Sequence, residues 1–347
     1  MKKIKSITIL LLVFSLSISV SLTSAAENSW LQKTSMSTAR FSFGVATLNG
    51  KIYAIGGALD TDSGEITSAN EEYDPTTDLW TTKAAMPTPR YGCAVAAYQN
   101  KIYVFGGATN SGSYTNATEV YDPATNSWTT KTAMPTARIL LDANVVDNKI
   151  YLIGGYGNQT ANEAYDPETD SWTTKTSTPS PVVAYASAVV DNKIYVIRGT
   201  STNSTQIYDP QTGTWSLGAS IPVGVSGAGA ATVTYAESTK AIYVVGGETD
   251  IFSPQNLTQV YFPENNSWTF DASLPVPTSR LCVAVVDNAL YAIGGTRAII
   301  HQGLTDNISY APSSIIPEFG SWIILPFALL TTFIIVLCKR KLTQTTH

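Results

Sequence analysis

Six near-copies of one sequence pattern run through this 347-residue chain. Each copy has an apolar stretch ending in a glycine pair, then Tyr-Asp-Pro, a short polar turn and a tryptophan, as in Gly56-Gly57, Tyr73-Asp74-Pro75 and Trp80. The tryptophans at positions 30, 80, 128, 172, 215 and 268 are separated by 50, 48, 44, 43 and 53 residues. This period is too long for a solenoid of helical pairs and is typical of a four-stranded unit.

Turn chemistry divides each unit into strands. Short side chains that tolerate positive φ precede one strand of most units, as in Asn49-Gly50 and Asp147-Asn148, and predict a tight hairpin. The second strand of this hairpin is an unbroken apolar run such as Ile52-Tyr53-Ala54-Ile55, which is typical of a sheet covered on both faces. Sheets stacked face to face around an axis meet that requirement.

These residues resemble the kelch repeat family, over about residues 30 to 312, and the resemblance implies a β-propeller with one repeat per blade. We name the strands of each unit a to d: b ends in the glycine pair, c holds the tyrosine and d opens with the tryptophan. The last unit ends at Tyr310 and lacks strand d, while Trp30 opens a d strand at the N-terminus. The sequence therefore predicts an all-β, six-bladed kelch propeller over residues 27–312, closed by an N-terminal strand d in the last blade.

The two ends predict a membrane location. Residues 1–26 have a basic start, an apolar stretch and small residues before Glu27, the layout of a secretory signal peptide. After a linker (313–320), residues 321–338 are apolar and would span roughly 27 Å as a helix, which is enough to cross a bilayer. The basic start of the tail (339–347) favours a single-pass protein in the cell membrane with its propeller outside. Pro317-Glu318-Phe319-Gly320 resembles PEF-type C-terminal sorting signals.

Composition argues against several functional classes. A net charge of −5 gives no reason to expect nucleic acid, and three cysteines do not make a disulfide framework. The predicted propeller (27–312) holds one histidine, His301, and no His or Cys grouping has metal-ligand spacing, so we expect no metal, no cofactor and no enzymatic activity. Asp142 is the odd carboxylate on an inner a strand, where a structural acceptor and a catalytic role are both open.

Arginine and lysine separate between the two faces of the predicted ring. The a-to-b and c-to-d turns share one face, on which lysines such as Lys51 and Lys149 lie, whereas all six arginines of the propeller fall on the opposite face. The rigid guanidinium fork matches carboxylate, phosphate or sulfate. We therefore predict these ligand-binding residues: Arg40, Arg90, Arg138, Arg198, Arg280 and Arg297.

A structural interpretation of the arginines is also open. Arg40, Arg90 and Arg138 end equivalent loops, where an arginine can bond carbonyl groups of the adjacent blade. Arg280 lies two residues closer to its a-to-b turn, and Arg198 replaces the first glycine of its pair. Arg198 and Arg297 break the repeat pattern and are the better individual candidates for a specific role.

The sequence favours a cell-surface kelch propeller that binds an extracellular protein or an acidic glycan without catalysis. The family resemblance leaves open an enzyme that acts on an acidic sugar at the arginine face, in the manner of a sialic-acid epimerase. A structural component of a surface layer is the third hypothesis. Six Asn-X-Ser/Thr motifs are candidate glycosylation sites, at Asn116, Asn158, Asn203, Asn256, Asn265 and Asn307.

Overall fold

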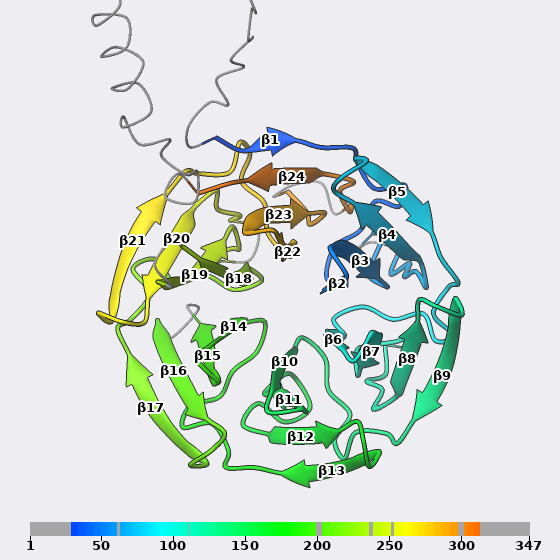
Figure 1. Cartoon of the computed structure of the whole chain (residues 1–347), viewed down its shortest axis with the longest axis horizontal. Helices are drawn as coiled ribbons and strands as arrows, with labels where there is room; N and C mark the ends of the chain where they lie inside the picture. Colours follow the sequence, from blue (N-terminus) through cyan, green and yellow to red (C-terminus); the bar gives the residue numbers. More distant parts are fainter. Residues whose placement is uncertain are drawn as a thin grey trace, which may run out of the picture.

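The structure, a computed structural model, describes residues 29–60, 63–110, 112–198, 203–235, 239–250, 253–297 and 302–312. These residues form six four-stranded antiparallel sheets arranged as the blades of a closed ring (Figure 1). The six-bladed propeller that the repeats predict is confirmed. The segments predicted as signal peptide (1–26), linker (313–320), membrane helix (321–338) and tail (339–347) lie outside the described residues. Within the described ranges, no helix is long and apolar enough to span a membrane.

Each blade runs a, b, c, d from the axis outward. Blade 1 consists of β2 (Gly44–Leu48), β3 (Lys51–Ile55), β4 (Asn70–Asp74) and β5 (Leu79–Thr82). Blade 2 consists of β6 (Ala94–Tyr98), β7 (Lys101–Phe105), β8 (Thr118–Asp122) and β9 (Ser127–Lys131). Blade 3 consists of β10 (Asp142–Val146), β11 (Lys149–Ile153), β12 (Asn162–Asp166) and β13 (Ser171–Thr174). Blade 4 consists of β14 (Ala186–Val190), β15 (Lys193–Arg198), β16 (Ser204–Asp209) and β17 (Thr214–Gly218). Blade 5 consists of β18 (Gly229–Thr234), β19 (Lys240–Val245), β20 (Thr258–Phe262) and β21 (Ser267–Asp271). Blade 6 consists of β22 (Cys282–Val286), β23 (Ala289–Ile293), β24 (Asn307–Tyr310) and β1 (Leu31–Gln32).

The N-terminal strand closes the ring as predicted. β1 pairs antiparallel with β24, with Leu31 opposite Ser309 (Figure 1). The strand is shorter than the expected segment from Trp30 to Met36. The strand ends at Gln32. In the segment that follows, the Met36 side chain is buried, and the Met36 backbone N–H donates to the carbonyl of Thr305 at 2.9 Å.

The core lies between the blades, where the repeated aromatic residues stack. Tyr73 is fully buried, with its ring centroid 5.0 Å from Trp80 and 5.8 Å from Tyr291 of the preceding blade. The Trp80 indole N–H donates to the carbonyl of Thr34 at 2.8 Å, which ties blade 1 to the strand that closes blade 6. The aromatic copies therefore fill the space between blades.

Backbone conformation explains the glycine pairs and the hairpin turns. Gly56 has a φ of 67°, and a Cβ atom there would lie 2.6 Å from the carbonyl oxygen of Arg90 on the next blade, so no larger residue fits. Asp147 and Asn148, in the turn between β10 and β11, have φ values of 47° and 61°, as the predicted tight hairpin requires.

On the lysine face, lysines and aspartates form ion pairs within each of the first four blades. The Tyr-Asp-Pro aspartates cap their own c-to-d turns, as where Asp74 Oδ1 accepts the N–H of Thr76 at 2.9 Å. The same aspartates bind the lysine of the a-to-b turn in the first four blades: Lys51–Asp74, Lys101–Asp122, Lys149–Asp166 and Lys193–Asp209. These aspartates therefore have a structural role in the turns.

Candidate functional site

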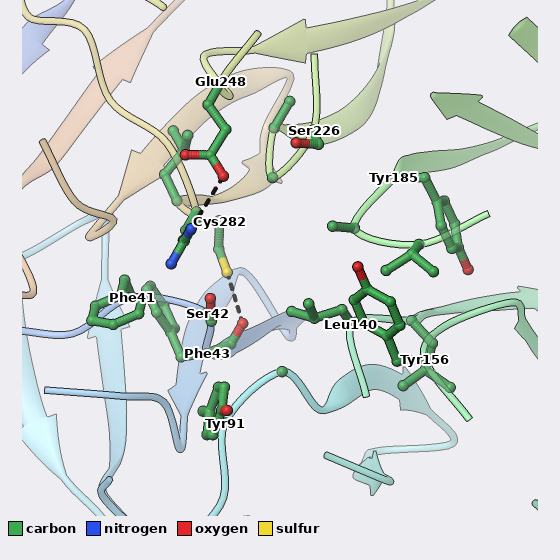
Figure 2. A pocket seen from close by; sticks show the side chains of 18 of the residues that line it. Phe41, Ser42, Phe43, Tyr91, Leu140, Tyr156, Tyr185, Ser226, Glu248 and Cys282 are labelled. Atoms are coloured by element: carbon green, nitrogen blue, oxygen red, sulfur yellow. Dashed lines mark hydrogen bonds and ion pairs between the residues drawn. The ribbon is translucent and has the colours of Figure 1, made fainter. Parts of the chain in front are cut away.

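A cavity of about 670 Å³ opens on the face that carries the b-to-c and d-to-a loops. We call it the mouth cavity (Figure 2). All six blades contribute to its lining. The side chains that can recognise a ligand in it are Tyr91, Tyr156, Arg198, Glu248, Asp250 and Arg280. Aromatic side chains of the lining thus come from blades 1 to 4, since Phe41, Phe43 and Tyr185 also contribute to it, and charged groups come from blades 4 to 6.

A closed circle of backbone hydrogen bonds surrounds the cavity. In each d-to-a loop one residue donates its N–H to the equivalent carbonyl of the preceding blade, at 2.6 to 3.0 Å. All six of these residues have positive φ: Ser42, Gly92, Leu140, Ala184, Gly227 and Arg280. Since these N–H groups are already bonded, the side chains of the cavity determine what it binds.

Three of the predicted arginines lie in buried ion pairs. Arg40, Arg90 and Arg138 are 0% exposed. Their guanidinium groups bind glutamates on strand c of their own blade: Arg40–Glu71, Arg90–Glu119 at 2.8 Å and Arg138–Glu163 at 2.6 Å. Burial lowers the pKa of Arg40 and Arg90, and the paired glutamates oppose that shift.

The same arginines also join blades, through their backbone. The Arg90 carbonyl accepts the N–H of Gly57 on blade 1, while its side chain bonds the carbonyls of Val104 and Ala117 in its own blade 2. The expected side-chain bonds to the adjacent blade are therefore replaced by bonds within the blade. This geometry favours the structural interpretation of the three arginines, whose ligand-binding role stays a prediction.

Arg280 occupies a different place from the three buried arginines. Its two-residue offset puts it in the backbone ring, with a φ of 55°, and its side chain in the mouth cavity. Its Nη2 lies 3.2 Å from Glu248 Oε1, and its Cζ lies 5.9 Å from the ring centroid of Phe41. A non-glycine residue with positive φ carries strain of about 1 kcal/mol or more, which is often retained where a side chain has a role.

Arg198 is the cavity arginine without a carboxylate partner among the described residues. Its Nη1 donates to the carbonyl of Pro181 at 2.7 Å, and its buried Nε has no hydrogen-bond partner. Because Arg198 replaces the glycine, β15 continues through it and its side chain contributes to the cavity wall.

Arg297, the sixth candidate, is bound to Asp306 at 2.5 Å and is not among the described residues of the cavity wall. His301 lies outside the described residues. The structure therefore brings Arg198 and Arg280 into one cavity and leaves the other four arginines in ion pairs elsewhere.

Sequence reasoning missed the glutamates that bind the buried arginines. A signal was present, because the residue two before the tyrosine is Glu71, Glu119 or Glu163 where the loop has arginine. Blades 4 and 5 instead combine Val182 with Gln206 and Val225 with Gln259, whose side-chain amides bond the backbone of Ser180 and Val223. Arginine and glutamate are thus present together or replaced together, which indicates that their side chains contact each other.

One candidate glycosylation site is buried. Asn307 is 0% exposed, and its Nδ2 donates to the carbonyl of Thr34 at 3.2 Å. In the folded protein this motif has no room for a glycan.

Comparisons with known proteins agree with this architecture. The family model described as the KLHDC2/KLHL20/DRC7 Kelch-repeats domain matches residues 42–222. Kelch-like protein 28 of Homo sapiens is 33% identical over 66 residues, covering 19% of this chain and 12% of that protein. Kelch-like ECH-associated protein 1A of Danio rerio is 39% identical over 66 residues, covering 18% of this chain and 11% of that protein. The chain thus spans about one eighth of the curated relatives that it matches.

A solved structure of YjhT shares the fold. It superposes with a TM-score of 0.69 at 18% sequence identity, covering 83% of this chain and 98% of that one. At this level of identity the likeness concerns the fold alone.

Proposed function

Because this chain belongs to the KLHDC2/KLHL20/DRC7 Kelch-repeats domain family, we propose that it is a cell-surface binding module that takes an extracellular protein or glycan into the mouth cavity. Kelch propellers commonly serve in protein interaction, and the signal-like start and apolar segment near the C-terminus favour an extracellular propeller. Strand c of blade 6 ends on the face of the a-to-b turns, and β1 begins on that face, directly after Trp30. The face of the a-to-b turns would therefore adjoin the membrane. The mouth cavity would then face outward.

The observation that carries the proposal is the guanidinium of Arg198 in the mouth cavity, where the two arginines are equal in number to the two acidic side chains, Glu248 and Asp250. Arg198 has no carboxylate partner among the described residues, while Arg280 has one partially exposed partner at 3.2 Å. An anionic group of a ligand would pair with Arg198, and Tyr91 and Tyr156 would contact its apolar part. Ligand pockets commonly combine apolar walls with a few convergent polar groups.

An Arg198→Ala substitution tests this placement. We expect affinity to fall about 10-fold to 100-fold, since a hydrogen bond to a charged group contributes about 1.5 to 3 kcal/mol. The ligand would be found by screening the propeller (27–312) on glycan and peptide arrays, and the dissociation constant measured by calorimetry. Arg297→Ala, which removes a charge outside the cavity, serves as the comparison. Equal affinity losses in the two variants would contradict a mouth site.

Arg280 should act as a displaceable cation. Arg280→Gly and Ala184→Gly relieve the same positive-φ strain, so neither should lower the melting temperature by more than about 2 °C. Only Arg280→Gly should weaken binding, because only it removes a cation from the cavity. Glu248→Gln frees the guanidinium and should tighten binding of an anionic ligand. If Glu248→Gln weakens that binding, Glu248 itself contacts the ligand and the displacement model fails.

An acidic-sugar enzyme is the second candidate function. Two arginines in one cavity, with the partly exposed carboxylate of Asp142 next to the lining residue Leu141, are the observation in its favour. Exchange between the anomers of N-acetylneuraminic acid, followed by NMR, measures the activity directly. A rate equal to that of the uncatalysed reaction excludes this epimerase-like activity.

A further inference from the structure

The seam between the inner strands of blades 3 and 4 is polar. Asp142 and Asn144 of β10 face Ser187 of β14 there. At other seams the equivalent positions are apolar: Gly44 lies against Val95 and Gly229 against Val283. Glycine and valine therefore suffice for ring closure, and closure alone gives no reason for a carboxylate at this position.

The polar seam has more side-chain hydrogen-bond acceptors than side-chain donors, although the backbone N–H of Ala143 also donates to Asp142 Oδ1 at 2.9 Å. Ser187 Oγ donates to Asp142 Oδ2 at 2.7 Å and accepts from Asn144 Nδ2 at 2.8 Å. A hydroxyl has one proton, so Asn144 Oδ1, which is 3.2 Å from Ser187 Oγ, is left without a donor. Asn144 and Ser187 are only 5% and 6% exposed, and an unpaired acceptor at that depth is costly. The Tyr185 hydroxyl adds no donor, because its proton goes to the carbonyl of Ile153 at 2.6 Å.

The seam also lacks positive charge. Among the described residues, no ion pair includes Asp142. Arg138, four residues earlier, is bound to Glu163. The other titratable groups nearby are Tyr185 and Cys282, and burial raises the pKa of both, so they stay neutral. Burial likewise raises the pKa of Asp142, while hydrogen bonds from Ser187 and from the backbone N–H of Ala143 oppose that shift.

We propose that Asp142, Asn144 and Ser187 form a binding site for a primary ammonium group. Such a group has three N–H donors, which match the carboxylate, Asn144 Oδ1 and Ser187 Oγ. The set is a poor one for calcium, which takes about six to eight oxygen ligands. Within the described ranges, no group of three or more His, Cys, Asp or Glu residues could hold a metal.

The ammonium group would enter through the mouth cavity. Asp142 keeps some solvent exposure, and two of its neighbours, Leu141 and Tyr185, line that cavity. An extended alkylammonium such as a lysine side chain has the slender shape that reaches down from the cavity. The proposed site would thus take a lysine side chain of a ligand between the inner strands β10 and β14, separate from the arginine contacts proposed above.

Thermal unfolding of the propeller (27–312) with n-butylammonium, a mimic of the lysine side chain, tests the site. At a concentration about tenfold above its dissociation constant, it should raise the melting temperature by about 3 °C. Butyltrimethylammonium has the same charge but no N–H donors, and butanol has no charge, so neither should stabilise the protein. Calcium chloride tests for a metal site, and glucosamine tests whether an amino sugar replaces the alkylammonium.

The shift should depend on Asp142 and on pH. Because the pKa of Asp142 is raised, a larger fraction of Asp142 is ionised at higher pH, and the ammonium shift at about pH 8.5 should exceed that at about pH 5. Without ligand, the stability of the protein should change with pH in the opposite direction. Because the pKa of Asp142 is raised in the folded state, the wild-type protein should lose stability as the pH rises toward that pKa. The Asp142→Asn variant should lack this loss. Asp142→Asn should abolish the ammonium shift, while Asp147→Asn, in the exposed turn after the same strand, should keep it.

Three outcomes would overturn the proposal: no stabilisation by n-butylammonium at about pH 8.5, an equal shift in Asp142→Asn, or an equal shift with butyltrimethylammonium. Stabilisation by calcium alone would replace the ammonium site with a metal site. Arg198→Ala should keep the full ammonium shift, so the failure of this proposal and the failure of the anion site can be told apart.

Discussion

A chain that starts at Ser37 should melt at least about 10 °C below one that starts at Glu27. The deleted segment contains β1, whose pairing with β24 closes blade 6. It also contains Trp30, which stacks on Tyr310 at 5.2 Å and donates its indole N–H to the carbonyl of Ala272 at 2.9 Å. Loss of one buried tryptophan costs about 3 to 5 kcal/mol, and the deletion also exposes the edge of β24.

Calorimetry of the two chains measures this effect. Trp30→Ala should give a smaller loss, about half or less of that of the deletion, because the backbone pairing of β1 remains. If the chain that starts at Ser37 melts at the same temperature as the longer one, β1 does not contribute to closure.

Arg90→Ala should destabilise the propeller by about 3 to 5 kcal/mol, because it leaves Glu119 as an unpaired buried charge. Glu119 is 3% exposed, and the substitution also removes the donor to the carbonyls of Ala117 and Val104. Urea unfolding, with the slope compared between variants, measures the difference.

The double variant Arg90→Val/Glu119→Gln is the matched control. It copies the pairing of blades 4 and 5, where the glutamine amide bonds the backbone two residues before the valine. We expect it to recover at least about half of the stability lost in Arg90→Ala, since no buried charge remains unpaired. A double variant as unstable as the single one would show that the guanidinium bonds, and not the charge, determine the stability.

The fold was predictable because its determinants repeat within each unit. The glycine pair, the Tyr-Asp-Pro turn and the tryptophan act over a few residues, so their spacing predicts each blade, and the unequal ends predict the closure through Trp30. The candidate site was predictable only in part. Because Arg198 breaks the repeat pattern, the sequence singled it out as a candidate, but it paired Arg198 with Arg297, whereas the cavity pairs it with Arg280.

What the sequence determined by itself is the local geometry of each blade and the number of blades. The tertiary structure decided which arginines are free, because a charge is neutralised by a partner that folding brings close. Glu119 lies 29 residues from Arg90, and Glu248 lies 32 residues from Arg280. It also decided that Asp142 faces Ser187, which lies 45 residues away on the next blade. A repeat pattern predicts strands and turns, whereas burial and charge pairing depend on which side chains of neighbouring strands and blades meet.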